Sequence, residues 1–161
     1  MGETLSVGLG EIVVSENHDD VLVAYGLGSC LGIACYDKDA IIAGMLHAVL
    51  PEPNGNANNV DARYVVQGVP LLIDQVINAG ATRSKLTIRM AGGANMLNSP
   101  GFQNVLNIGK RNIAAAEAVF EKTSIPVVGR DVGGNTGRTV RFYVRDGRMM
   151  IRRLGGEEIE L

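Results

Sequence analysis

Short apolar runs rich in valine and isoleucine alternate with glycine-containing turns through the first fifty residues. An apolar run of this length between turn residues is typical of a buried strand. The pattern therefore predicts three successive strands, at residues 21–25, 31–36 and 41–50. The segment that follows, 51–59, is so rich in proline, glycine and asparagine that we expect a loop.

Two later segments have apolar residues at helical spacing. The first spans 61–79, ends before Gly80 and contains Pro70, which predicts a kink or two abutting helices. The second spans about 109–121, with Asn107 as its N-cap. Strands are predicted between and after these helices, at 85–90, 125–128, 138–144 and 148–153, the last two forming a hairpin around Asp146-Gly147.

The order of these elements predicts the fold class. Strands that follow one another through short turns favour antiparallel sheets over a doubly wound parallel sheet. The 161 residues contain no repeat, low-complexity tract or linker that would divide them, so we expect one domain spanning 1–161. The prediction is an α+β fold with mainly antiparallel sheets and the two main helices on one outer face.

Composition and charge exclude several classes of function. The net charge is −2 and the basic residues are scattered, which argues against nucleic acid as a ligand. No apolar stretch is long enough to span a bilayer, so membrane insertion is not expected. The N-terminus has no basic segment followed by an apolar run, so a secretory signal is not expected and the protein is predicted to be cytoplasmic.

The two cysteines are predicted to be free thiols. If 31–36 is a strand, the Cα atoms of Cys30 and Cys35 lie roughly 16 Å apart at about 3.3 Å per residue. A disulfide needs Cα atoms within about 7 Å, and the same spacing argues against a shared metal site. We therefore expect a reducing compartment and no metal.

Cys30 is the sharpest candidate for chemistry. It follows the turn Gly26-Leu-Gly-Ser29 and begins a strand, so its sulfur can project from the end of a sheet. Backbone N–H groups around Gly28 and Ser29, released from strand pairing by the turn, can stabilise an oxyanion. The alternative is that Cys30 is a small buried hydrophobe, as Cys35 is expected to be on the apolar face of its strand.

His47 is a polar side chain in an otherwise apolar strand, where it needs a partner. One interpretation is a core histidine satisfied by a local hydrogen bond. The other is catalytic: Cys30 opens one strand, His47 ends the strand that returns beside it, and an imidazole in contact with a thiol activates it. The catalytic interpretation is stronger for the two residues taken together than for either residue alone.

Several motifs resemble those of the CheD family of chemoreceptor glutamine deamidases, in the same order along nearly the whole chain. Any one of these glycine motifs is weak evidence, but five in order with the Cys–His pair are specific. They are Gly26–Cys30, His47 with Leu50-Pro51, Ala91–Met96, Ile108-Gly109 with Arg111-Asn112, and Asp131–Gly134 with Gly137-Arg138.

The resemblance implies a fold, a reaction and partners. The fold would be an α/β/β sandwich, and the reaction would be hydrolysis of glutamine to glutamate on the cytoplasmic domains of chemotaxis receptors. Some family members also bind the phosphatase CheC. The family's catalytic cysteine and histidine map onto Cys30 and His47. Its members carry a threonine six residues before the cysteine, where this chain has Ala24, so the histidine must be oriented by a backbone carbonyl or another side chain.

The mechanism expected from the pair needs no metal or organic cofactor. Cys30 attacks the carboxamide, N–H groups near Gly28–Cys30 hold the oxyanion, and a thioester forms and is hydrolysed. Gly92 and Gly93 are expected to line the site; the alternative is that they serve only to form tight turns. Two further readings stay open: a largely non-catalytic binding partner of CheC or a receptor, and deamidation of some other protein.

Overall fold

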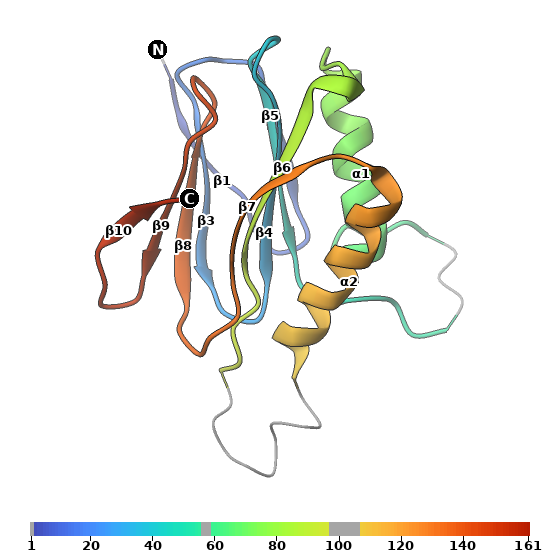
Figure 1. Cartoon of the computed structure of the whole chain (residues 1–161), viewed down its shortest axis with the longest axis vertical. Helices are drawn as coiled ribbons and strands as arrows, with labels where there is room; N and C mark the ends of the chain where they lie inside the picture. The colour runs from blue at the N-terminus through green and yellow to red at the C-terminus, as the bar shows by residue number, and fades with distance from the viewer. Residues whose placement is uncertain (1, 56–58, 97–106) are drawn as a thin grey trace.

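Two five-stranded sheets lie face to face, and two helices cover the outer face of one of them (Figure 1). The computed structural model describes residues 2–55, 59–96 and 107–161. The layers are therefore helices, sheet and sheet, which confirms the predicted α/β/β sandwich. Residues 56–58 of the predicted 51–59 loop lie outside the described residues.

The outer sheet, which we call sheet A, has the strand order β1-β3-β8-β9-β10. Only β1 and β3 are parallel among its pairs, and the others are antiparallel. The predicted hairpin is formed by β8 and β9. The strands are β1 (Thr4–Ser6), β3 (Val21–Leu27), β8 (Arg138–Tyr143), β9 (Met149–Arg153) and β10 (Glu158–Glu160).

The middle sheet, sheet B, has the order β2-β5-β4-β6-β7 and is antiparallel except for β6 and β7. Its strands β4 and β5 are buried at every residue, because helices cover one face and sheet A covers the other. The strands are β2 (Ile12–Ser15), β4 (Leu31–Asp37), β5 (Ile42–Ala48), β6 (Leu86–Gly92) and β7 (Val127–Val132).

The helices are α1 (Val65–Asn78) and α2 (Ile108–Thr123), with a short 3-10 turn, η1, at Arg83–Lys85. Asn107 caps α2 as predicted, its side chain accepting a hydrogen bond from the Lys110 N–H at 3.3 Å. Pro70 was predicted to cause a kink or to separate two abutting helices; the second outcome is wrong, since α1 runs through Pro70 as one helix. Among the described residues no helix is long and apolar enough to cross a membrane.

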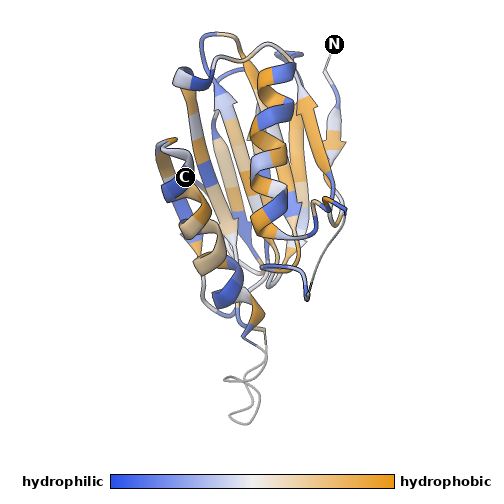
Figure 2. Ribbon diagram, turned by 90° about the vertical axis from the view of Figure 1, so that its right-hand side faces the viewer, coloured by the Kyte–Doolittle hydropathy of each residue, from blue (hydrophilic) through white to orange (hydrophobic). Residues whose placement is uncertain are grey.

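Two apolar clusters, one on each side of sheet B, fill the interior. Leu31, Ile33 and Cys35 face the helices, as the alternation along the strand predicts. Ala34 and Tyr36, on the other face of β4, pack against sheet A. Figure 2 shows the helices from outside, with strongly apolar strands behind them. The side-chain alternation of β4 thus decides which layer each residue meets.

The differences between prediction and structure lie mostly at sheet edges. The strands β1, β2 and β10 were not predicted, because three or four residues carry too little pattern and their pairing partners define them. The strand predicted at 125–128 is wrong at its end. β7 continues through Asp131 and Val132, which the sequence assigned to a loop, because its parallel pairing with β6 extends to Gly92.

Candidate active site

Cys30 lies in the short turn that carries the chain from sheet A to sheet B. β3 in sheet A ends at Leu27, and β4 in sheet B begins at Leu31. The Cys30 side chain is partly buried and packs against the apolar cluster between the sheets. Cys35 is a free thiol fully buried on the helix side of β4. The two sulfurs therefore face different layers, as expected.

His47 lies on β5, directly opposite Gly32 of β4. Met45, two residues before His47, belongs to the apolar cluster between the sheets against which Cys30 packs, so His47 and Cys30 lie on the same side of sheet B. Leu31, which follows Cys30, pairs with Ala48, which follows His47. Within the described ranges the Cys30 sulfur forms no hydrogen bond with the imidazole.

The imidazole is held by the backbone of the β1–β2 connection. His47 is only 5% exposed, and its Nδ1 lies 2.9 Å from the carbonyl oxygen of Val7. A carbonyl only accepts, so Nδ1 must carry the proton, which leaves the lone pair on Nε2. The backbone of His47 is also bound to this connection, through Gly10 N–H at 2.8 Å and the Glu11 carbonyl at 3.1 Å. These hydrogen bonds hold the imidazole ring and the backbone of His47 in one orientation.

The hydroxyl absent at position 24 is therefore not needed to orient the histidine. Ala24 is fully buried, and its Cβ lies 3.8 Å from the place that a Cβ on Gly32 would occupy. The Val7 carbonyl supplies the hydrogen bond instead. Sequence reasoning missed Val7, because a backbone carbonyl carries no signal in the residue type.

The backbone carbonyls of the turn that bears Cys30 all accept hydrogen bonds. Ala94 N–H donates to the Gly28 carbonyl and Gly93 N–H to the Cys30 carbonyl, each at 2.9 Å. The Ser29 carbonyl accepts from the side chain of Asn112, also at 2.9 Å. In the part of the chain that the structure describes, the N–H groups of residues 28–30 donate no hydrogen bond.

Gly92 and Gly93 support this turn through close backbone contact. Gly92 has φ +113°, and a Cβ there would lie 2.1 Å from the Cys30 carbonyl oxygen. Gly93 has φ +71°, and its Cβ would lie 2.6 Å from Ile113 of α2. Both positions therefore require glycine. The structure brings Gly28, Ser29, Gly92 and Gly93 together with Cys30, with Gly92 and Gly93 behind the turn.

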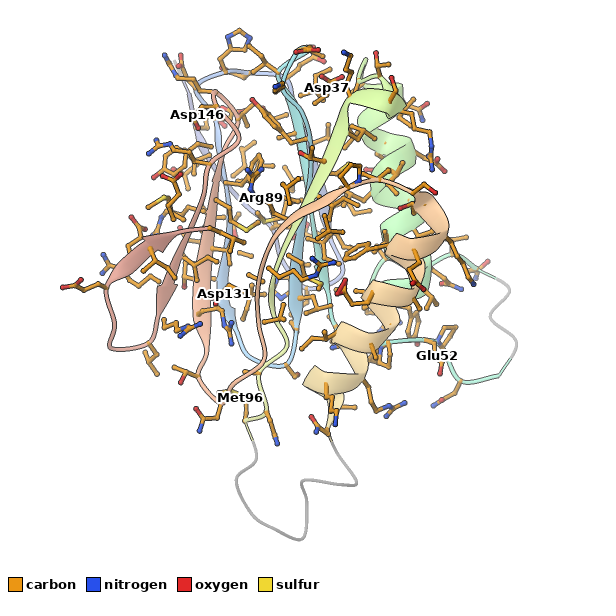
Figure 3. All side chains as sticks on the ribbon, in the orientation of Figure 1. Asp37, Glu52, Arg89, Met96, Asp131 and Asp146 are labelled. Carbon is orange, nitrogen blue, oxygen red and sulfur yellow. The ribbon has the colours of Figure 1, made fainter. Side chains whose placement is uncertain are left out.

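Arg138 orders the neighbouring loop that carries the Asp131–Gly134 motif. Its side chain is almost fully buried and donates to the Asp131 carbonyl at 2.6 Å and to the Gly133 carbonyl. Burial lowers the pKa of Arg138, and the negative charge of Asp131 opposes that shift. Gly133 N–H in turn donates to the Gly92 carbonyl at 2.9 Å. Figure 3 labels Asp131 and Met96, whose side chains lie in the lower half of that view.

Burial raises the pKa of the Cys30 thiol above its ordinary value. It raises the pKa of Cys35 much further, to about 12. A raised pKa favours the protonated form of the Cys30 thiol at neutral pH. A nucleophilic role for Cys30 would therefore require a base to take the thiol proton during attack.

A cysteine-dependent hydrolase uses a thiol, an imidazole and nearby backbone N–H groups, and the structure places such groups together, with N–H groups that donate to no described residue. The family model described as CheD chemotactic sensory transduction matches residues 49–153. The chain belongs to the CheD family. That match begins just after His47, whereas the relatives described next align with almost the whole chain.

Three similar proteins are each named "Probable chemoreceptor glutamine deamidase CheD". The chain is 38% identical to the one from Caldanaerobacter subterraneus subsp. tengcongensis, over 94% of this chain and 93% of that protein. It is 40% identical to the one from Symbiobacterium thermophilum, over 97% and 96%. The Pyrococcus abyssi protein is 37% identical, over 99% and 98%.

One solved structure is similar at a lower level. It is a Neisseria meningitidis protein of the family DUF152, with a TM-score of 0.41 and 14% identity. The alignment covers 86% of this chain and 61% of that chain. A likeness this distant carries no argument about the site.

Proposed function

We propose that this protein hydrolyses glutamine side chains of chemotaxis receptors to glutamate in the cytoplasm, with Cys30 as nucleophile and His47 as base. The names of its relatives, such as the Symbiobacterium thermophilum protein, support the reaction and the receptor as substrate. The observation that carries the assignment of residues is the hydrogen bond from His47 Nδ1 to the Val7 carbonyl, which leaves the imidazole lone pair on Nε2, with His47 on the side of sheet B that Cys30 shares.

The first half of the reaction transfers the acyl group to the enzyme. Nε2 of His47 takes the Cys30 proton as the sulfur attacks the carboxamide carbon, and the carbonyl electrons move to oxygen. The N–H groups of Ser29 and Cys30, which have no other acceptor among the described residues, stabilise this oxyanion. The oxyanion then collapses, the C–N bond breaks, and the imidazolium protonates the leaving nitrogen. Ammonia departs and a thioester remains.

The second half returns the enzyme to its starting state. His47 Nε2 takes a proton from water as the water oxygen attacks the thioester carbon. The tetrahedral intermediate expels sulfur, which recovers its proton from the imidazolium, and glutamate is released. Atoms balance with one water consumed and one ammonia produced.

A non-catalytic binding partner of CheC or of a receptor is the second candidate. The raised pKa of Cys30 favours it, because an adaptor has no use for a reactive thiol. The same observation fits a hydrolase in which the thiol is deprotonated only during attack. Turnover on a receptor fragment therefore distinguishes the hydrolase from the binding partner.

Incubation with a receptor cytoplasmic fragment tests the proposal. Peptide mass spectrometry should show specific glutamines gaining the mass that accompanies replacement of NH2 by OH, together with release of ammonia. Cys35→Ala is the matched control, since it removes the thiol on the helix side and should keep the activity. A wild-type protein that binds the fragment but leaves every glutamine intact would establish the adaptor instead.

A further inference from the structure

The side chain of Asn112 connects the turn that bears Cys30 to the segment that follows His47. It lies on α2, is 0% exposed, and its Nδ2 donates to the Ser29 carbonyl and to the Val49 carbonyl, each at 2.9 Å. Ser29 directly precedes Cys30, and Val49 follows His47 by two residues. One side-chain amide thus contacts both strands within two residues of the candidate catalytic pair.

This contact stands where the strand pairing itself has ended. The last residues paired between β4 and β5 are Leu31 and Ala48. Beyond them the Val49 N–H turns away and donates to the Arg63 carbonyl at 2.8 Å. The Asn112 amide therefore bridges the two segments at the point where β4 and β5 are no longer paired with each other. It fixes the separation of these segments beside Cys30 and His47.

The same bond fixes the direction of a backbone N–H. No peptide bond in the described residues is cis, so the N–H of Cys30 points away from the carbonyl of Ser29 across a planar peptide unit. Asn112 holds that carbonyl toward α2. The Cys30 N–H is consequently directed away from the helix layer, as an oxyanion donor near the sulfur must be.

The orientation of the Asn112 amide is settled by its partners. Both contacts are to carbonyl oxygens, which accept only, so the NH2 group must face them. Asn112 Oδ1 is buried and has no hydrogen-bond partner among the described residues. An unpaired buried oxygen costs stability, which is unexpected if the residue serves only to stabilise the fold.

We propose that Asn112 is a positioning residue for the deamidation reaction: it aims the Cys30 N–H at the oxyanion. The proposal rests on the proposed function, and it assigns a role to a residue that touches neither substrate nor reacting atoms. Its effect should appear in the chemical step. Binding of the receptor should be unchanged.

The test compares Asn112→Ala and Asn112→Leu with wild type on a receptor fragment. Asn112→Leu keeps the approximate volume but has no hydrogen-bond donor. Both variants should lower kcat by about tenfold to a hundredfold, less than the loss of a complete oxyanion donor, while KM changes less than about threefold. Ser15→Ala is the control, because Ser15 is also buried and hydrogen-bonded but lies at the other end of the β2–β5 pair.

Alkylation by iodoacetamide separates positioning from loss of structure. Displacement at a saturated carbon forms no oxyanion, so the labelling rate of Cys30 should stay within about threefold of wild type in both variants. Cys35 reports on the fold, since it becomes labelled only when the helix layer opens. Thermal unfolding of each variant gives the folded fraction by which kcat is corrected.

Three results would overturn the proposal. One is a corrected kcat near wild type in both variants. Another is a loss confined to KM, and the third is a loss of kcat matched by rapid labelling of Cys35, which would make Asn112 purely structural. A wild-type protein without deamidase activity would contradict the proposed function as a whole, and is thereby distinguishable from failure of the Asn112 proposal alone.

Discussion

Val7 contributes to the site through its carbonyl oxygen, whereas His47 and Cys30 contribute side chains. The 2.9 Å contact with Nδ1 fixes the tautomer, and so decides which nitrogen can act as the base. This arrangement predicts that Cys30 and His47 act as a unit. Substitutions at the side chain of Val7 should matter only through packing.

Cys30→Ala and His47→Ala should each abolish deamidation while the protein stays folded. Either change removes one partner of the same proton transfer, so each should remove nearly all of the rate. Turnover on a receptor fragment measures the effect, and His18→Ala, in an exposed turn, serves as the histidine control. Substantial residual turnover in Cys30→Ala would refute the assignment of the nucleophile.

The two thiols should differ in alkylation by iodoacetamide. A raised pKa lowers the thiolate fraction at a given pH, so Cys30 should react more slowly near neutral pH than a small exposed thiol, and faster as pH rises. Cys35, with a pKa of about 12 and a fully buried side chain, should remain unlabelled in the folded protein. Peptide mapping across a pH series checks both; labelling of Cys35 first would contradict the assignment of strand faces.

Ala24→Thr tests whether the histidine needs a hydroxyl. Because Val7 already orients His47, turnover should change by less than about tenfold, or roughly 1.4 kcal/mol in barrier height. The added hydroxyl is buried between the sheets, so the free energy of unfolding should fall by about 1–3 kcal/mol. A hundredfold gain in turnover would instead identify the natural chain as a weakened enzyme and favour the adaptor.

At the scale of elements, the end of β6 fixes the position of the turn that bears Cys30. The strand closes with Gly92 in contact with the Cys30 carbonyl, and Gly93 and Ala94 donate to that turn. The parallel neighbour β7 binds the same stretch from the other side. The geometry of the turn that bears Cys30 therefore depends on a strand that begins more than fifty residues later in the chain.

Gly92→Ala should therefore lower both stability and activity. The positive φ alone costs about 1–3 kcal/mol for a side chain, and the new Cβ also displaces the Cys30 carbonyl. Gly155→Ala is the matched control, since Gly155 has φ +77° but nothing within 4 Å of its added Cβ. Chemical denaturation and receptor turnover should separate the two; equal effects in both variants would show that backbone strain alone is responsible.

At the scale of the whole molecule, the site draws on all three layers. The turn of Cys30 crosses from sheet A to sheet B, His47 lies between the sheets, and Asn112 comes from the helix layer. The contact between the sheets is strengthened by Tyr36, whose ring packs edge-on against Phe142 with centroids 5.4 Å apart. Its hydroxyl donates to the Val144 carbonyl at 2.7 Å.

Tyr36→Phe should weaken the sandwich without altering the chemistry. The variant keeps the ring contact but leaves a buried carbonyl without its donor, which should lower the free energy of unfolding by about 1–3 kcal/mol. Turnover at a temperature where the variant is folded should match wild type, because Tyr36 lies far along β4 from Cys30. A large loss of kcat would mean that sheet spacing at this end is transmitted to the site.

The sequence by itself determined the class of fold, the faces of its central strands and the candidate pair. Apolar alternation along 31–36 separates Cys35 from Cys30, and the glycine turn before Cys30 marks the sheet end, because both are local properties of the residues. The family motifs likewise follow from residue order. Strand ends and three short strands were missed, since pairing partners decide them.

Only the tertiary structure decided how the pair is held. The Val7 carbonyl reaches His47 across 40 residues, and the Asn112 amide reaches Ser29 across 83. A carbonyl belongs to every residue, and an asparagine on a helix reads as an ordinary polar position. Their roles exist only because the packing of three layers brings distant backbone groups to the same few ångströms, and that packing follows from the whole chain at once.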